Sequence, residues 1–265
     1  MDISTLLAEI EKTAPLDGAA SWDCSGLQVA SPNKDIQRLG VSLDPTPASV
    51  EKALDLGCDG ILTHHPLTLS PRLPKALDAY HSVLRSLLRK DVPLYASHTS
   101  LDTNLQGPAA WLADELGLLK RKPLEPLPHD PTRGFGLCGD LPQAVSGQSF
   151  LQKLGDLVPE PTTTICGQLP EKICRVAYCT GSGASLLPLA KSAGADIYIS
   201  GDIKYHAALD ADIFIVDVGH HSLEEEMMHR FSQLLGKSLR IQVTFVPSQS
   251  PFRPMASQLS KQGDI

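Results

Sequence analysis

Three short segments of the sequence carry side chains that could bind metal ions. They are residues 62–66 (LTHHP), 97–102 (SHTSLD) and 217–224 (DVGHHSLE). Each follows an apolar, strand-like run, and open α/β sheets build their sites where strands end. Imidazole combined with carboxylate is a ligand set suited to Zn, Mn, Fe, Co or Ni. Together the three segments indicate a metal site better than any one of them does alone.

Each segment also has an ordinary structural interpretation. His64 and His65 could be surface or capping histidines, although neighbouring side chains on extended backbone point to opposite sides and so suit two separate ions. His98 and Asp102 could be ligands or simple turn residues. His220 and Glu224 share a face if a helix begins near His220, but an acidic first turn also stabilises a helix by itself. A pair of ions that shares a carboxylate would activate water and neutralise the charge of reacting oxygens.

The composition narrows the class of protein. With 265 residues, 42% of them hydrophobic, the chain can bury a substantial core, as one large domain or two smaller ones. Thirty acidic and 23 basic residues give a net charge of −7, and no block of Lys or Arg stands out, so nucleic acid is a poor candidate partner. We expect a cytoplasmic protein without membrane contact, because the sequence shows neither an export signal nor a long apolar run. Six cysteines form no C-x-x-C pair and are expected to act as small buried hydrophobic residues.

Strand-like and helix-like segments alternate along the chain, which predicts an α/β architecture. The spacing predicts helices over residues 2–13, 46–56, 80–90, 107–118, 149–157, 184–192 and 222–235. It predicts strands over residues 38–43, 60–63, 92–97, 173–179, 197–200, 213–217 and 242–246. Prolines at 123, 126, 128 and 131 indicate extended backbone, and we place a domain boundary there. The two halves share a rhythm of elements without a residue-level repeat.

The motifs extend over nearly the whole chain, and in their order and spacing the chain resembles the dinuclear-metal NIF-three-like family. Bacterial members of this family are often labelled GTP cyclohydrolase I type 2 homologues. The resemblance rests on segments 22–29 (WDCSGLQV), 42–46 (SLDPT), 62–67 (LTHHPL), 97–102 (SHTSLD), 180–186 (TGSGASL), 200–206 (SGDIKYH) and 219–224 (GHHSLE).

The resemblance implies a ligand set and an architecture. It implies two divalent metal ions per chain, of unknown identity among Zn, Fe, Mn, Co and Ni, with Glu224 as the bridge between them. The implied ligands are His64, His65, Asp102, His220 and Glu224. His98 falls near them, and we expect it to orient a ligand or to transfer a proton. The family further implies two similar, partly intertwined α/β lobes with the site in the cleft between them, assembled as a hexameric ring. We expect residues 1–122, completed by 222–265, to form the first lobe and residues 123–221 to form the second.

Some positions depart from the family or remain open. Cys24 stands where the family commonly has Asn, and residues 67–71 (LTLSP) differ from its usual apolar run. The segment from Trp22 to Leu27 is expected to be structural. The Gly181-Ser182-Gly183 turn is either a tight turn or a phosphate contact, since Leu186 replaces the third glycine of a nucleotide fingerprint. Asp202, Lys204 and His206 could line the cleft, form a subunit contact or stabilise turns.

Two functions fit these observations. The first is a metal-dependent hydrolase of a nucleotide-like or phosphorylated compound, similar to GTP cyclohydrolase I type 2. The second is a nonenzymatic metal-binding scaffold or regulatory protein that binds a partner. The sequence does not name the substrate, because a family resemblance transfers ligands better than it transfers substrates.

Overall fold

The computed structural model of the chain describes residues 1–160 and 162–255 and shows two mixed β-sheets, one in each of two units. The first unit comprises Met1–Trp111, Leu127–Gly134 and Glu224–Ser248. The second comprises Leu112–Pro126, Phe135–Leu223 and the described residues from Gln249 onward. The predicted α/β class with two lobes is confirmed.

The sheet of the first unit has the order β1-β4-β3-β2-β11. Its strands are β1 (Gly26–Val29), β2 (Arg38–Ser42), β3 (Gly60–Thr63), β4 (Leu94–Ala96) and β11 (Gln242–Phe245). Strands β2, β3 and β4 are parallel neighbours, β11 is parallel to β2, and β1 is antiparallel to β4. The carboxyl ends of β2, β3 and β4 therefore meet at one edge of the sheet.

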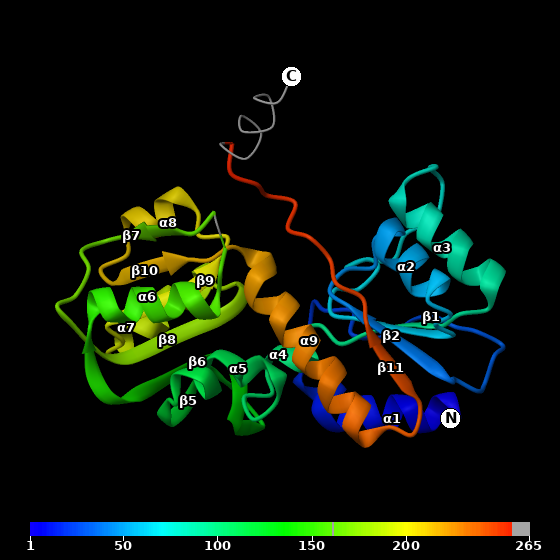
Figure 1. Cartoon of the computed structure of the whole chain (residues 1–265), viewed down its shortest axis with the longest axis horizontal. Helices are drawn as coiled ribbons and strands as arrows, with labels where there is room; N and C mark the ends of the chain where they lie inside the picture. Colours follow the sequence, from blue (N-terminus) through cyan, green and yellow to red (C-terminus); the bar gives the residue numbers. More distant parts are fainter. Residues whose placement is uncertain (161, 256–265) are drawn as a thin grey trace. The chain divides into compact units, whose positions relative to one another are not determined.

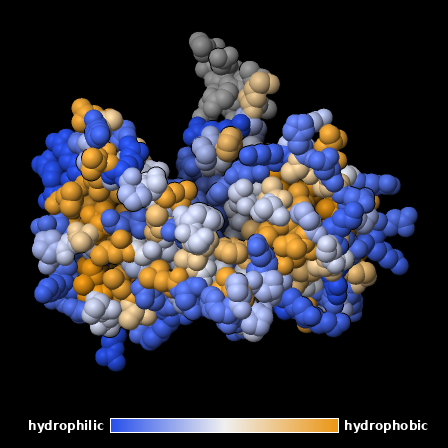
Figure 2. Space-filling model, turned by 180° about the vertical axis from the view of Figure 1, so that it is seen from behind, coloured by the Kyte–Doolittle hydropathy of each residue, from blue (hydrophilic) through white to orange (hydrophobic). Residues whose placement is uncertain are grey.

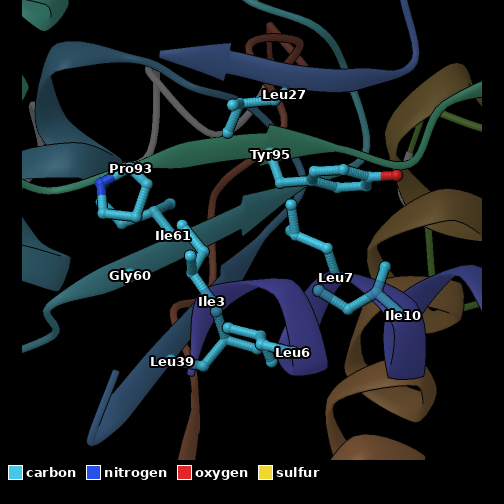
Figure 3. Close-up of a pocket in the computed structure, with 10 residues that line it drawn as sticks. All are labelled: Ile3, Leu6, Leu7, Ile10, Leu27, Leu39, Gly60, Ile61, Pro93 and Tyr95. Carbon is cyan, nitrogen blue, oxygen red and sulfur yellow. The ribbon is translucent and has the colours of Figure 1, made fainter. Parts of the chain in front are cut away.

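Helices cover both faces of this sheet (Figure 1). They are α1 (Ile3–Thr13), α2 (Pro47–Asp55), α3 (Ala79–Lys90), the short α4 (Thr99–Asp102) and most of α9 (His220–Ser238). Leu94 faces α2 and α3, where it packs with Val50 and Leu87. The next residue, Tyr95, faces α1 on the other side, where apolar side chains surround a gap of only about 10 Å³ (Figure 3). The alternation of side chains along β4 thus gives the unit its two hydrophobic layers.

Local signals explain why the α2 helix begins where it does. Thr46 and Ser49 form a reciprocal capping box, and Pro47 occupies the first turn, where its missing N–H is no loss. At the other end of the next helix, Asp91 takes a left-handed conformation with φ of 54°, which stops α3 and returns the chain to the sheet. These signals determine where the helices begin and end, and therefore where the loops that carry the polar residues at the edge of the sheet lie in the sequence.

The second unit has a six-stranded sheet with the order β5-β6-β8-β9-β10-β7. Its strands are β5 (Leu119–Leu127), β6 (Asp130–Ser146), β7 (Thr164–Cys166), β8 (Lys172–Ser182), β9 (Ile197–Gly201) and β10 (Phe214–Asp217). Strands β8, β9 and β10 are parallel neighbours. The helices of this unit include α6 (Gly147–Leu157), α7 (Leu187–Ser192) and α8 (Tyr205–Leu209). The core includes Tyr198 and Ile215, which pack with Leu187 of α7.

The proline-rich segment is extended, as predicted. It forms β5 and the start of β6. Pro123 and Pro126 are tolerated because β5 lies at the edge of the sheet, where a missing N–H breaks no ladder. The sequence analysis also missed the short strands β1 and β7 and helix α8. The expected helix over 107–118 is a 3₁₀ turn (Pro108–Ala110) followed by α5 (Trp111–Leu116).

The surface mixes polar and apolar side chains. On the face drawn in Figure 2, hydrophobic residues lie among hydrophilic ones. Within the described residues, no helix combines the length and the apolar character that a membrane span requires.

Candidate metal centre

The candidate site of the first unit lies where its parallel strands end. Asp44 follows β2, His64 and His65 follow β3, and His98 follows β4. Helix α4 begins directly after His98 and carries Asp102 at its last position. Glu224 comes from helix α9. The fold therefore brings together side chains from four distant parts of the chain.

His64 is the most buried member of the cluster. It is fully buried, and its Nδ1 donates to the carbonyl oxygen of Ser97 at 2.8 Å. Its Nε2 lies 3.7 Å from Asp102 Oδ1 and 3.4 Å from Glu224 Oε1. Among the described residues, none makes a hydrogen bond to this nitrogen. A buried nitrogen without a hydrogen bond, aimed between two carboxylates, is what a metal ligand would look like before the ion is added.

His65 approaches the same carboxylate from its other oxygen. Its Nδ1 donates to Asp44 Oδ1 at 2.7 Å, and its Nε2 lies 3.2 Å from Glu224 Oε2. Glu224 thus offers one oxygen to each of two neighbouring imidazoles while it is almost completely buried itself. Each oxygen of Glu224 therefore faces a different imidazole.

His98 completes the imidazole cluster. Its donor atoms lie within 4.8 Å of those of His64 and His65. Its Nδ1 donates to Asp23 Oδ1 at 2.7 Å, and Asp23 also accepts from Ser25 and Thr99. Burial alone would raise the pKa of Asp23, but these hydrogen bonds outweigh it and hold the pKa well below its ordinary value. Asp23 therefore stays ionised and fixes the ring of His98.

His220 belongs to the second unit and is the first residue of α9. Its Nδ1 donates to Asp202 Oδ2 at 2.7 Å. Asp202 follows β9 and adopts a left-handed conformation with φ of 56°. Because α9 is continuous, His220 lies one turn before Glu224 and on the same side of the helix.

All four imidazoles share one arrangement. The Nδ1 of each ring donates a hydrogen bond, and the acceptors are Ser97 for His64, Asp44 for His65, Asp23 for His98 and Asp202 for His220. The Nε2 atom of each ring is therefore the one that could bind a metal ion. Metal-ligating histidines almost always donate their second ring nitrogen to a carboxylate or a carbonyl in this way, which fixes the tautomer and raises the basicity of the ligand. The arrangement is therefore consistent with a metal site.

The electrostatics of the cluster favour positive charge. Burial disfavours a charged His65, but Asp44 and Glu224 outweigh this effect and raise its pKa to about 10. Burial acts in the same direction on His64, and the charges of Asp102 and Glu224 again raise its pKa above the ordinary value. The carboxylates thus favour positive charge at the positions where a cation would bind.

The donor set fits a divalent metal ion. The donor atoms of His64, Asp102 and Glu224 lie within 4.8 Å of one another, as do those of His64, His65 and His98. Imidazole nitrogen with carboxylate oxygen suits first-row transition metals and zinc. The predicted residues His64, His65, His98, Asp102 and Glu224 are thus brought together within the first unit, and the cluster is consistent with a metal site.

The carboxylates that hold the rings are not predicted from the sequence. Asp23 and Asp44 lie inside the motifs that carry the family resemblance, but the motifs predict no role for Asp44 and only a structural role for the segment of Asp23. Asp202 was considered without a specific partner. The signal that could have found Asp44 and Asp202 is their position directly after a parallel strand, beside the strand that carries the histidine.

The Gly181-Ser182-Gly183 turn has a clear structural reason for its glycines. Gly181 has φ of 60°, which favours glycine. A Cβ on Gly183 would lie 2.4 Å from Tyr198 Oη, and that hydroxyl donates to the Gly183 carbonyl oxygen at 2.7 Å. Close packing inside the second unit therefore accounts for this motif without a phosphate.

Comparisons with known proteins identify the family to which this chain is similar. The model of the family described as Duf34/NIF3 (NGG1p interacting factor 3) matches residues 1–251. A Lactococcus lactis protein named GTP cyclohydrolase 1 type 2 homolog is 31% identical over 252 residues, which cover 91% of this chain and 92% of that protein. The solved structure of Staphylococcus aureus protein SA1388 shares the fold, with a TM-score of 0.86, 24% identity and coverage of 96% and 99%. Reduced HcgD from Methanocaldococcus jannaschii is 26% identical, with a TM-score of 0.80 and coverage of 93% and 98%.

Proposed function

The chain belongs to the Duf34/NIF3 family, and we propose that it is a metal-dependent hydrolase that acts on a nucleotide-like or phosphorylated compound. One observation carries this proposal. Glu224 turns its two oxygens to the Nε2 atoms of His64 and His65, each ring being held from behind through Nδ1. This arrangement supports the proposal of two cations around one carboxylate.

We assign the ligands of two ions from these contacts. One ion would be held by His64, Asp102 and Glu224, and the other by His65, Glu224 and His220. The position of His220 one turn before Glu224 on the continuous helix α9 supports its assignment. The hydrogen bond from His220 to Asp202 supports it further, because it repeats the bond from His65 to Asp44.

Two divalent ions, when bound, would supply Lewis-acid polarisation and would lower the pKa of water toward neutrality. The protein's own residues would orient and exchange protons. Asp23 holds the Nδ1 of His98, and a ring nitrogen of His98 lies within 4.8 Å of the donor atoms of His64 and His65, so we assign His98 the transfer of a proton to or from the substrate. A partly exposed ring, such as that of His98, can exchange this proton with solvent between turnovers.

The substrate class rests on the relatives. Proteins named GTP cyclohydrolase 1 type 2 homolog match this chain over most of its length. We propose a nucleotide-like substrate on this ground, with purine ring opening as the most specific case. The assembly is also proposed from the family resemblance: a homohexameric ring, which light scattering would detect as six times the chain mass of 28.5 kDa.

The test is turnover combined with metal analysis. Protein stripped of metal and reloaded with Zn, Mn, Fe or Co would be given a panel of nucleotides and phosphoesters. We expect about two ions per chain and hydrolysis of at least one compound, abolished by His98→Ala with its ions retained. A fully loaded protein that hydrolyses nothing would refute the enzymatic proposal and would favour a metal-binding scaffold. Less than one ion per chain would refute the metal site itself.

A further inference from the structure

Trp22 stands at the candidate site in a turn whose backbone is firmly held. The Asp23 N–H donates to the carbonyl oxygen of Ala20 at 2.9 Å, which closes a turn around Ser21 and Trp22. The Ala20 N–H donates to Thr99 Oγ1 at 2.9 Å, beside the start of α4. Asp23, immediately after Trp22, has a fully buried side chain that binds His98, Ser25 and Thr99. The position of the Trp22 Cα is therefore fixed relative to His98.

The side chain of Trp22 is exposed in spite of this rigid backbone. It is 60% exposed, whereas Trp111, the other tryptophan of the chain, is 2% exposed. A tryptophan that only stabilises a fold is normally buried over most of its large surface, as Trp111 is. The expected structural role for the segment from Trp22 to Leu27 therefore does not explain the exposed indole.

The indole contacts the imidazole cluster through His98. The two ring centroids lie 5.7 Å apart at an interplanar angle of 73°. The ring of His98 lies in turn 5.2 Å from that of His64 and 5.5 Å from that of His65. A planar group that lay on the free part of the indole would thus be next to the residue to which we assign proton transfer.

The charges around these rings favour an uncharged planar group at this position. The side chains that hold the imidazoles of the first unit are the carboxylates of Asp23 and Asp44, and the cluster also contains Asp102 and Glu224. Carboxylates repel a phosphate that lacks a cation, while an aromatic face accepts any heteroaromatic base by stacking. The carboxylates therefore mark the position for cations, and the indole of Trp22 marks the position for an aromatic ring.

We propose that Trp22 is the stacking platform for the heteroaromatic base of a nucleotide-like substrate. This inference rests on the proposed function and deepens it, because it assigns the base to Trp22 and leaves the phosphates to the bound cations. It makes Trp22 a specificity-determining residue that separates nucleotides from phosphorylated compounds without a base.

The chain offers a direct probe, since Trp22 is the exposed tryptophan of two. Guanosine, GMP and GTP would be titrated into the metal-loaded protein while indole emission is followed, with ribose 5-phosphate and tripolyphosphate as ligands without a base. We expect quenching by the three purine compounds only. Equilibrium dialysis would then give the dissociation constants for Trp22→Leu, which removes the ring, and for Trp22→Phe, which keeps a smaller one.

Trp22→Leu is expected to weaken nucleotide binding about fivefold to a hundredfold, the effect of losing one base–aromatic stack. Trp22→Phe should restore part of the loss, and the metal content of both variants should equal that of the wild type. Leu88→Ala serves as the control, because Leu88 is 58% exposed on α3 in the same unit and should leave binding unchanged.

The outcomes separate this inference from the proposed function. Wild-type protein that binds metal and nucleotide, with an equal dissociation constant in Trp22→Leu, would overturn the role of Trp22 and leave the metal site intact. Equal quenching by tripolyphosphate, absence of nucleotide binding, or loss of metal from Trp22→Leu would overturn it as well. Wild-type protein that binds no metal would instead refute the proposed function, and quenching by guanosine would still report on the platform.

Discussion

Metal binding to this cluster should release protons, and the structure sets how many. His65 has a pKa of about 10 in the metal-free protein, so near pH 7.5 its ring carries a proton on the nitrogen that faces Glu224. The pKa of His64 is raised as well, by Asp102 and Glu224 against the effect of burial. A metal ion can bind these rings only after the protons leave. We therefore expect at least about one proton, that of His65, to be released when the ions bind.

The number of protons released also predicts how the affinity for metal ions depends on pH. Each displaced proton changes the apparent association constant about tenfold per pH unit. Between pH 7 and pH 8 the affinity should therefore rise by about tenfold if only His65 releases a proton and by about a hundredfold if His64 does so too. Mn²⁺ is a suitable probe for chelator competition over this range.

Calorimetry in two buffers with different protonation enthalpies would count the protons directly. Asp44→Asn removes one of the carboxylates that raise the pKa of His65, and it should reduce both the proton count and the slope. Asp35→Asn, at an exposed carboxylate of the same unit, should change neither. An affinity that is independent of pH, or a release of less than half a proton, would show that the rings are neutral in the metal-free protein and would refute the electrostatic argument.

Three further predictions follow from the same contacts. Glu224→Ala should empty both metal positions, whereas Asp102→Ala should empty one, and elemental analysis of the two purified variants would measure the difference; equal losses would contradict the assignment of Glu224 as the bridge. Asp202→Asn should lower the affinity for one of the two ions by about tenfold to a hundredfold, because it removes the carboxylate that holds the ring of His220. Competition with a chelator would measure this affinity. The stability that His65 contributes to the metal-free protein should be complete below pH 6.5, where the ring is protonated in both the folded and the unfolded state, and should be lost as the pH rises toward about 10. Urea midpoints measured above pH 6.5 should therefore fall over this range, and midpoints that rise would contradict the predicted sign.

The sequence predicts best those features that depend on neighbouring residues. The predicted strand over 60–63 and the predicted helix over 80–90 agree with β3 and α3 to within one residue. His64 and His65 are adjacent, and His220 and Glu224 share a helix, so both pairs are visible in the chain itself. Periodicity and caps are local signals, and they need no knowledge of the tertiary structure.

The sequence predicts poorly those features that depend on the sheet. Proline argues against a central strand, and only the position of β5 at the sheet edge allows Pro123 and Pro126 there. Strand β1 has only four residues, which is too short for a periodicity signal. Its partner β4 lies about seventy residues away in the chain, so the pairing cannot be recognised from neighbouring residues. The hydrogen bond from His98 to Asp23 joins residues 75 positions apart. Such a contact exists only after the sheet has formed.

In each of the two units, an aspartate holds a histidine ring through the same kind of hydrogen bond. In the first unit, Asp44 follows β2 and holds the Nδ1 of His65, which follows the parallel neighbour β3. In the second unit, Asp202 follows β9 and holds the Nδ1 of His220, which follows the parallel neighbour β10. The pairs are separated by 21 and 18 residues, and both bonds measure 2.7 Å. A strand, its crossover helix and the next parallel strand set this separation, because the carboxyl ends of both strands meet at one edge. The similar rhythm of the two halves therefore has a chemical counterpart: each half supplies one imidazole whose Nε2 is made available by an aspartate from the preceding strand.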